Sequence, residues 1–109
     1  MSLFTIKQGD TSPAIEAVLR SPNGDVVDLT GATVRFFMRS NDGVRFVDAP
    51  ATIDGATEGI VVYEWSQTDT DTPGLNHAEW RVTFPDGTIE TFPNSEFLQI
   101  HIPSKIEDN

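Results

Sequence analysis

The stretch His77-Ala78-Glu79-Trp80-Arg81-Val82-Thr83-Phe84 alternates apolar and polar side chains along its whole length. Successive side chains of a β-strand point to opposite faces of a sheet, so this alternation predicts a strand with one buried face. The next residues, Pro85-Asp86-Gly87, are typical of a tight hairpin turn that ends such a strand. The side chains expected in the core are Ala78, Trp80, Val82 and Phe84.

Residues 33–39 and 60–65 show the same period of two and extend the expected sheet. Both stretches are rich in β-branched and aromatic residues, which pack well on a pleated surface. Phe37 differs from its aromatic neighbours because its phase puts it on the face opposite to the core. The expected core side chains of these two stretches are Val34, Phe36, Met38, Val61, Tyr63 and Trp65.

Weaker strand patterns fill the rest of the chain, with turn residues between them. We expect strands over residues 13–20, 26–29, 44–47, 88–92 and 97–102, a less regular stretch over 48–53 and a polar loop over 66–74. The chain lacks the long helical patterns that parallel strand crossovers require, which disfavours an α/β fold. The sequence therefore predicts an all-β antiparallel sandwich of about 7–9 short strands.

Size and composition indicate one globular domain. The chain has 109 residues, of which 38% are hydrophobic and 22% are charged. A chain of this length can bury enough surface for one core, and its composition is that of a folded chain rather than a disordered one. We expect residues 1–103 to form the domain and residues 104–109 to form a polar tail.

The charge of the chain excludes several classes of partner. Its 17 acidic and 7 basic residues give a formal net charge of −10. Nucleic acids and anionic membrane surfaces both attract clustered Lys and Arg, so we expect neither as a partner. No apolar run approaches the roughly 20 residues that a membrane-spanning helix needs. The chain has no cysteine, which excludes disulfides and thiolate metal sites.

The residue types that could support catalysis do not form a recognisable site. A serine nucleophile needs a histidine base beside it, but His77 and His101 lie where surface residues are expected. Glu64 and Glu79 fall on strands that we expect to pair, yet a glycosidase needs its two carboxylates to flank a cleft. Our interpretation is that the protein is not an enzyme and uses no cofactor.

The polar loop offers the candidates for cation binding. Thr68-Asp69-Thr70-Asp71-Thr72 supplies carboxylates and hydroxyls, and hard cations such as Ca²⁺ prefer oxygen ligands. The loop lacks the glycine and terminal glutamate of a full calcium loop, and an isolated Asp-x-Asp is more often a turn or a cap. We expect no metal site, with Asp69 and Asp71 as the residues to test by calcium titration.

Aromatic residues raise the question of a binding surface. Trp65 and Trp80 could stack on a sugar if they were exposed, but their phase assigns both to the core. Phe37 is the strongest candidate for an apolar contact with another protein because it lies opposite to the core face. The interface candidates are Phe37, Phe4 and Phe97.

Five short motifs are spread in order over nearly the whole chain. They are Ile6-Lys7-Gln8-Gly9-Asp10-Thr11, Asp28-Leu29-Thr30-Gly31-Ala32-Thr33-Val34, Gly74 through Phe84 with Pro85-Asp86-Gly87 behind it, Thr91-Phe92-Pro93, and Ile100-His101-Ile102. Together they resemble the N-terminal domain of the phage baseplate upper protein family. This resemblance implies an immunoglobulin-like β-sandwich, and it carries over no catalytic residues.

The resemblance also implies a role in the phage virion. The expected function is that of a structural protein that docks onto other tail, baseplate or head proteins through the edges and loops of the sandwich. Its expected partners are other phage virion proteins and further copies of itself, in a virion assembled in the host cytoplasm. The alternative is a carbohydrate- or host-surface-binding module on the same fold, which glycan binding through an exposed aromatic residue would reveal.

Overall fold

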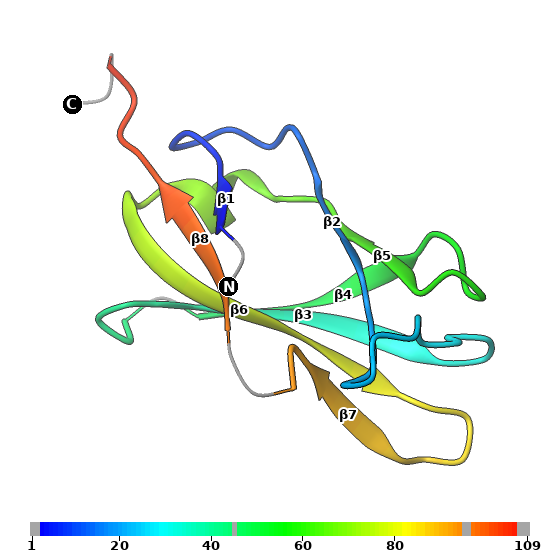
Figure 1. The fold of residues 1–109 in the computed structure, drawn as a ribbon. Helices are drawn as coiled ribbons and strands as arrows, with labels where there is room; N and C mark the ends of the chain where they lie inside the picture. The colour runs from blue at the N-terminus through cyan, green and yellow to red at the C-terminus, as the bar shows by residue number, and fades with distance from the viewer. Residues whose placement is uncertain (1–2, 45, 95–96, 107–109) are drawn as a thin grey trace.

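The computed structural model describes residues 3–44, 46–94 and 97–106 (Figure 1). Among these residues the regular elements are strands and one short 3-10 helix, η1, so the predicted all-β fold is confirmed. The elements in chain order are β1 (Leu3–Thr5), β2 (Ile15–Val18), β3 (Thr33–Ser40), β4 (Phe46–Ile53), β5 (Ile60–Tyr63), η1 (Gln67–Thr70), β6 (Gly74–Thr83), β7 (Ile89–Phe92) and β8 (Leu98–Ile102).

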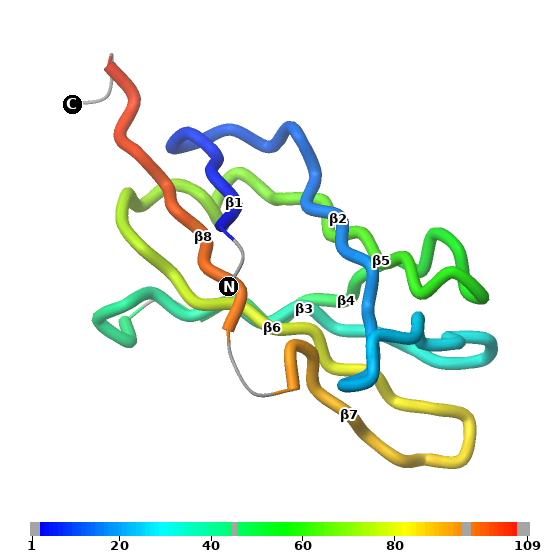
Figure 2. The backbone as a smooth tube through the Cα atoms, in the orientation of Figure 1, coloured from blue at the N-terminus to red at the C-terminus, as the bar shows by residue number. Residues whose placement is uncertain are grey.

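The strands form one continuous sheet that curls into two packed layers (Figure 2). Its order is β1-β8-β6-β3-β4-β5-β2, and β7 also pairs with β6. β4 makes the corner, because residues 46–51 pair with β3 whereas Thr52 and Ile53 pair with β5. The pairs between described strands are antiparallel except for β1 and β8, which run parallel. The sandwich is thus one folded sheet whose strand order begins with β1 and ends with β2.

An aromatic cluster fills the space between the two layers. Phe36 on β3 is fully buried and stacks on Tyr63 of the opposite layer, with 4.5 Å between ring centroids. Its ring also meets Trp65 and Trp80 edge-on, at 5.6 and 4.9 Å. Stacked and edge-to-face contacts of this kind add to the stabilisation from burial. The predicted core side chains are all buried, except that Phe84 is partly buried against this cluster.

The structure differs from the prediction in two segments of the N-terminal half, residues 3–5 and 26–29. β1 was not expected, because three residues are too short to show a period and their partner β8 is distant in the sequence. The strand expected over residues 26–29 is wrong, because only a single bridge joins Arg20 to Val26. The Asp28 carboxylate accepts hydrogen bonds from the backbone N–H and the hydroxyl of Thr30, so these residues form a turn rather than a strand.

β4 is longer and more regular than predicted. A strand was expected over residues 44–47 and irregular chain over 48–53, but β4 runs from Phe46 to Ile53 through Pro50. Between residues 46 and 51 this strand pairs with β3 and lies at an open edge. An edge strand tolerates proline because its missing N–H can face away from the partner strand.

Candidate functional site

The outer face of the large sheet, turned away from the core, carries a cluster of aromatic and arginine side chains. β4, β3, β6 and β8 lie side by side in this order. The cross-strand register places Arg39 of β3 between Phe46 of β4 and His77 of β6. We define the aromatic–arginine face as Arg35, Phe37, Arg39, Phe46, Asp48, His77, Glu79, Arg81 and Phe97.

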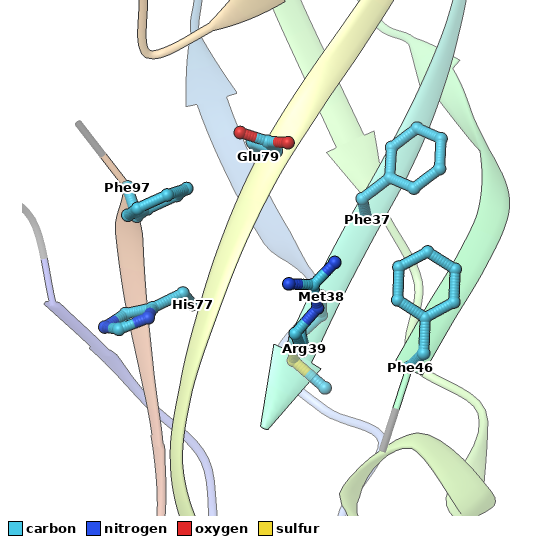
Figure 3. Close-up of a pocket in the computed structure, with 7 residues that line it drawn as sticks. All are labelled: Phe37, Met38, Arg39, Phe46, His77, Glu79 and Phe97. Atoms are coloured by element: carbon cyan, nitrogen blue, oxygen red, sulfur yellow. The ribbon is translucent and has the colours of Figure 1, made fainter. Parts of the chain in front are cut away.

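Two aromatic pairs flank Arg39 on this face (Figure 3). Phe37 and Phe46 form one pair, with 6.0 Å between ring centroids. His77 stacks nearly parallel on Phe97 to form the other, at 5.2 Å and an interplanar angle of 19°. A shallow depression of about 180 Å³ lies among these side chains. The arrangement presents two apolar patches with a cationic side chain between them.

Two of the four aromatic side chains on this face leave about half of their surface exposed to water. Phe46 is 56% exposed and Phe97 is 51% exposed, whereas Phe37 and His77 are half-buried. Single exposed apolar residues are common on protein surfaces, but neighbouring ones that form a patch mark interaction sites. A partner that covered this face would remove both aromatic pairs from water.

The charge of this face differs from that of the rest of the molecule. Three of the seven basic residues of the chain lie on it, against two carboxylates, in a protein of net charge −10. The guanidinium carbon of Arg81 lies 4.3 Å from the centroid of the Phe37 ring, in a cation–π contact. The Arg35 side chain donates to Asp48 at 2.7 Å. The face is therefore a locally basic area on an acidic molecule.

The loop that contains the two candidate cation ligands, Asp69 and Asp71, is held by hydrogen bonds within it and from neighbouring residues. The Asp69 carboxylate accepts from the Tyr63 hydroxyl at 2.5 Å and from the Ser66 backbone N–H at 2.9 Å. Burial and the Asp69 carboxylate raise the pKa of Tyr63 well above its usual value. The Asp71 carbonyl accepts from the Gln8 side chain. The part of the chain that the structure describes holds no cluster of three or more metal-ligand side chains. The expectation that Asp69 and Asp71 form no metal site stays a prediction.

The expected neighbourhood of Glu64 and Glu79 is wrong. Glu64 follows β5, which pairs with β2 and β4, whereas Glu79 lies on β6, which pairs with β3, β7 and β8. The two carboxylates therefore belong to different layers and do not flank a common cleft. His101 is exposed on β8, and His77 contributes its ring to the aromatic–arginine face.

The structure separates the three interface candidates. Phe37 and Phe97 both lie on the aromatic–arginine face. Phe4 is instead half-buried and stacks on Trp65, with 5.9 Å between centroids, so its role in an interface stays a prediction. Trp65 and Trp80 are buried in the core and present no platform for a sugar. Across the described ranges, no helix has the length and apolar character to cross a membrane.

The chain was compared with known families, curated proteins and solved structures. No curated protein matches it. The crystal structure of CopC from Methylosinus trichosporium OB3b is similar over 100% of this chain and 89% of that chain, with a TM-score of 0.55 and 10% sequence identity. At this identity the likeness concerns the fold alone. The family model of the BppU N-terminal domain matches residues 2–101, so the chain belongs to this family of phage baseplate upper proteins.

Proposed function

We propose that this domain is a non-enzymatic structural part of the phage virion, and that it docks onto another virion protein through the aromatic–arginine face. The family assigns the chain to the baseplate and leaves open which surface binds. The observation that supports this surface is the pair of exposed aromatic clusters on either side of Arg39.

The composition of the face is that of a protein–protein interface. Aromatic residues and arginine are enriched at such interfaces, and they contribute most of the binding energy in their centres. Phe46 and Phe97 would be the apolar anchors, because each leaves about half of its surface exposed in the isolated domain. Phe37 lies beneath Arg81 and supports the patch from the side of the sheet.

The scaffold fixes the backbone in the middle of this surface. β3 and β6 are the central strands of the large sheet and pair along eight residue positions, from Thr33 with Thr83 to Ser40 with Asn76. The backbone of paired central strands needs little further ordering when a partner binds, which favours affinity. A flat sheet face is suited to docking rather than to enclosing a small substrate.

The arginine side chains of this face indicate which chemical groups a partner would present. A partner surface with two apolar areas and a carboxylate between them would complement the two aromatic pairs and the guanidinium group of Arg39. If one particle holds several copies of the domain, their individually weak contacts together give a stable assembly. We therefore propose that the domain is a component of the virion, and that the virion is assembled in the host cytoplasm.

Photo-crosslinking tests this docking surface. The photoreactive residue p-benzoylphenylalanine replaces Phe46 or Phe97 in the chain, and phage particles are assembled with the substituted chain. Both positions should crosslink to a second virion protein, whereas the same residue at exposed Thr57, in the β4–β5 turn, should not. Crosslinks from Thr57 but not from Phe46 or Phe97 would reject the surface. Glycan binding that disappears in Phe46→Ala would instead support the carbohydrate-binding alternative.

A further inference from the structure

β2 lies at an open edge of the folded sheet. It pairs with β5 on one side, and it ends the order of the strands on the other. The backbone N–H of Leu19 donates to the Gly59 carbonyl at 2.8 Å, which fixes the direction of the backbone groups along the strand. In an antiparallel pair these groups alternate in direction, so those of Glu16, Val18 and Arg20 point away from β5.

The segment that follows β2 does not cover this edge. The Val27 backbone N–H donates to the Leu19 carbonyl at 2.9 Å. Gly59, at the start of β5, lies against both residues: a Cβ on Gly59 would be 2.9 Å from the Leu19 oxygen and 3.0 Å from the Val27 oxygen. The returning chain thus lies on the β5 side of β2, and the outward backbone groups remain accessible to an added strand.

The side chains at this edge are self-complementary. Glu16, Val18 and Arg20 share the outer face of the strand, and Val18 is 45% exposed. If two copies pair antiparallel about Val18, each Val18 lies opposite its counterpart and each Glu16 lies opposite Arg20 of the other copy. This register also matches the outward-pointing backbone groups, because all three residues present their N–H and C=O toward the open edge.

We propose that two copies of this chain associate by antiparallel pairing of β2 with β2, which continues the smaller layer from one copy into the other. Cross-strand pairs of opposite charge and of β-branched residues stabilise such a ladder. The Arg20 guanidinium donates to the Gly24 carbonyl at 2.9 Å, which uses one of its five N–H groups. A two-fold axis makes both copies use the same patch, as in most protein dimers.

An apolar groove beside this edge supports the same partner. It has a volume of about 400 Å³ and opens between β2 on one side and residues 92–93 and 97–98 on the other. A second copy seated on β2 would cover this groove and remove its apolar lining from water. Phe97 borders both this groove and the aromatic–arginine face, but the remaining residues of the two surfaces differ. The groove is lined by Ala17, Val18, Leu19, Arg20, Trp80, Phe92, Pro93, Phe97 and Leu98.

Reversing the charge at Glu16 and at Arg20 tests the proposal. Analytical ultracentrifugation measures the dimer dissociation constant at concentrations up to about 1 mM, where weak dimers form. Glu16→Arg and Arg20→Glu each place like charges opposite one another at two symmetric positions. Each should raise the dimer dissociation constant by about tenfold, and the double variant should restore it. Glu64→Arg and Lys7→Glu change the net charge equally at exposed positions and should leave the constant unaltered.

Three results would overturn the pairing. The first is a wild-type chain that stays monomeric at about 1 mM, where weak dimers form. The second is a dimer that the control substitutions weaken as much as the two single reversals do. The third is a dimer that is unaffected at Glu16 and Arg20 but is lost in Phe46→Ala, which would assign self-association to the aromatic–arginine face. Far-ultraviolet circular dichroism of every variant confirms that the fold is retained.

Discussion

Phe36 and Phe37 are consecutive residues of β3 whose side chains lie on opposite faces of the sheet. Truncating each to alanine therefore compares the contribution of the core with that of the proposed docking face. Phe36 is fully buried and meets Tyr63, Trp65 and Trp80 within the core. Phe37 is half-buried on the outer face. The two substitutions remove the same atoms from neighbouring positions, so any difference in their effects arises from the environment.

The structure sets the size of each effect. Phe36→Ala leaves a cavity in a close-packed core and should lower the free energy of unfolding by about 3–5 kcal/mol. Phe37→Ala removes the cation–π contact with Arg81 and one cross-strand pair, which together contribute about 1–2 kcal/mol. Domains of this size have a total stability of about 5–15 kcal/mol, so the first substitution removes a large part of it.

Urea denaturation followed by tryptophan fluorescence measures both losses, because Trp65 and Trp80 lie against Phe36. The melting temperature of Phe36→Ala should fall by at least about 12 °C, and by more than that of Phe37→Ala. Should Phe36→Ala fail to fold, Phe36→Leu gives a smaller loss that remains measurable. Equal losses at the two positions would refute the assignment of faces on β3.

The remaining predictions concern the loop and the turns. Tyr63→Phe should cost about 1 kcal/mol by removing the hydrogen bond to Asp69, and Asp69→Asn should lessen this cost in a double-mutant cycle of unfolding free energies. Hydrogen bonds from Thr88 lower the pKa of Asp86, so its contribution to stability is complete above the ordinary pKa of 3.8 and is lost as the pH falls through the lower folded value. Asp86→Asn should therefore flatten the acid side of the stability profile measured by denaturation at several pH values. Calcium should leave the melting temperature unchanged, because Tyr63 and Ser66 already engage Asp69; a rise on titration would contradict this.

The strong alternation of the sequence predicted the strands that form the centre of the sheet. In β3 and β6 the period of two persists over many residues, so the buried and exposed faces follow directly from the phase. The core around Phe36 and Trp80 could be predicted for this reason. The turn at Asp86 and Gly87 could also be predicted, because an Asp followed by a Gly is typical of a tight turn.

Pairing between distant segments could not be predicted in the same way. β1 depends on β8, and its three residues have no visible period. Glu64 and Glu79 lie in different layers because β4 and β5 turn away from β6, a consequence of the whole strand order. Such pairing joins residues that are distant in the sequence, so residue types and their spacing along the chain do not predict it.

The candidate surface was predicted in part. The phase of β3 singled out Phe37, but Phe46 is followed by apolar Val47, and two consecutive apolar residues give no phase. Phe46 turned out to be exposed and Val47 buried, because the register with β3 decides which one faces the core. The grouping of Arg39 with two aromatic pairs arises from the order of β4, β3, β6 and β8 and required the structure.

A cryo-electron microscopy map of phage particles that contain this chain tests the docking surface most directly. The proposal predicts that the domain lies in the baseplate with Phe46, Phe97 and Arg39 buried against a neighbouring virion protein whose carboxylates lie near the guanidinium group. A map in which the domain contacts its neighbours through other surfaces, with the aromatic–arginine face open to solvent, would contradict it.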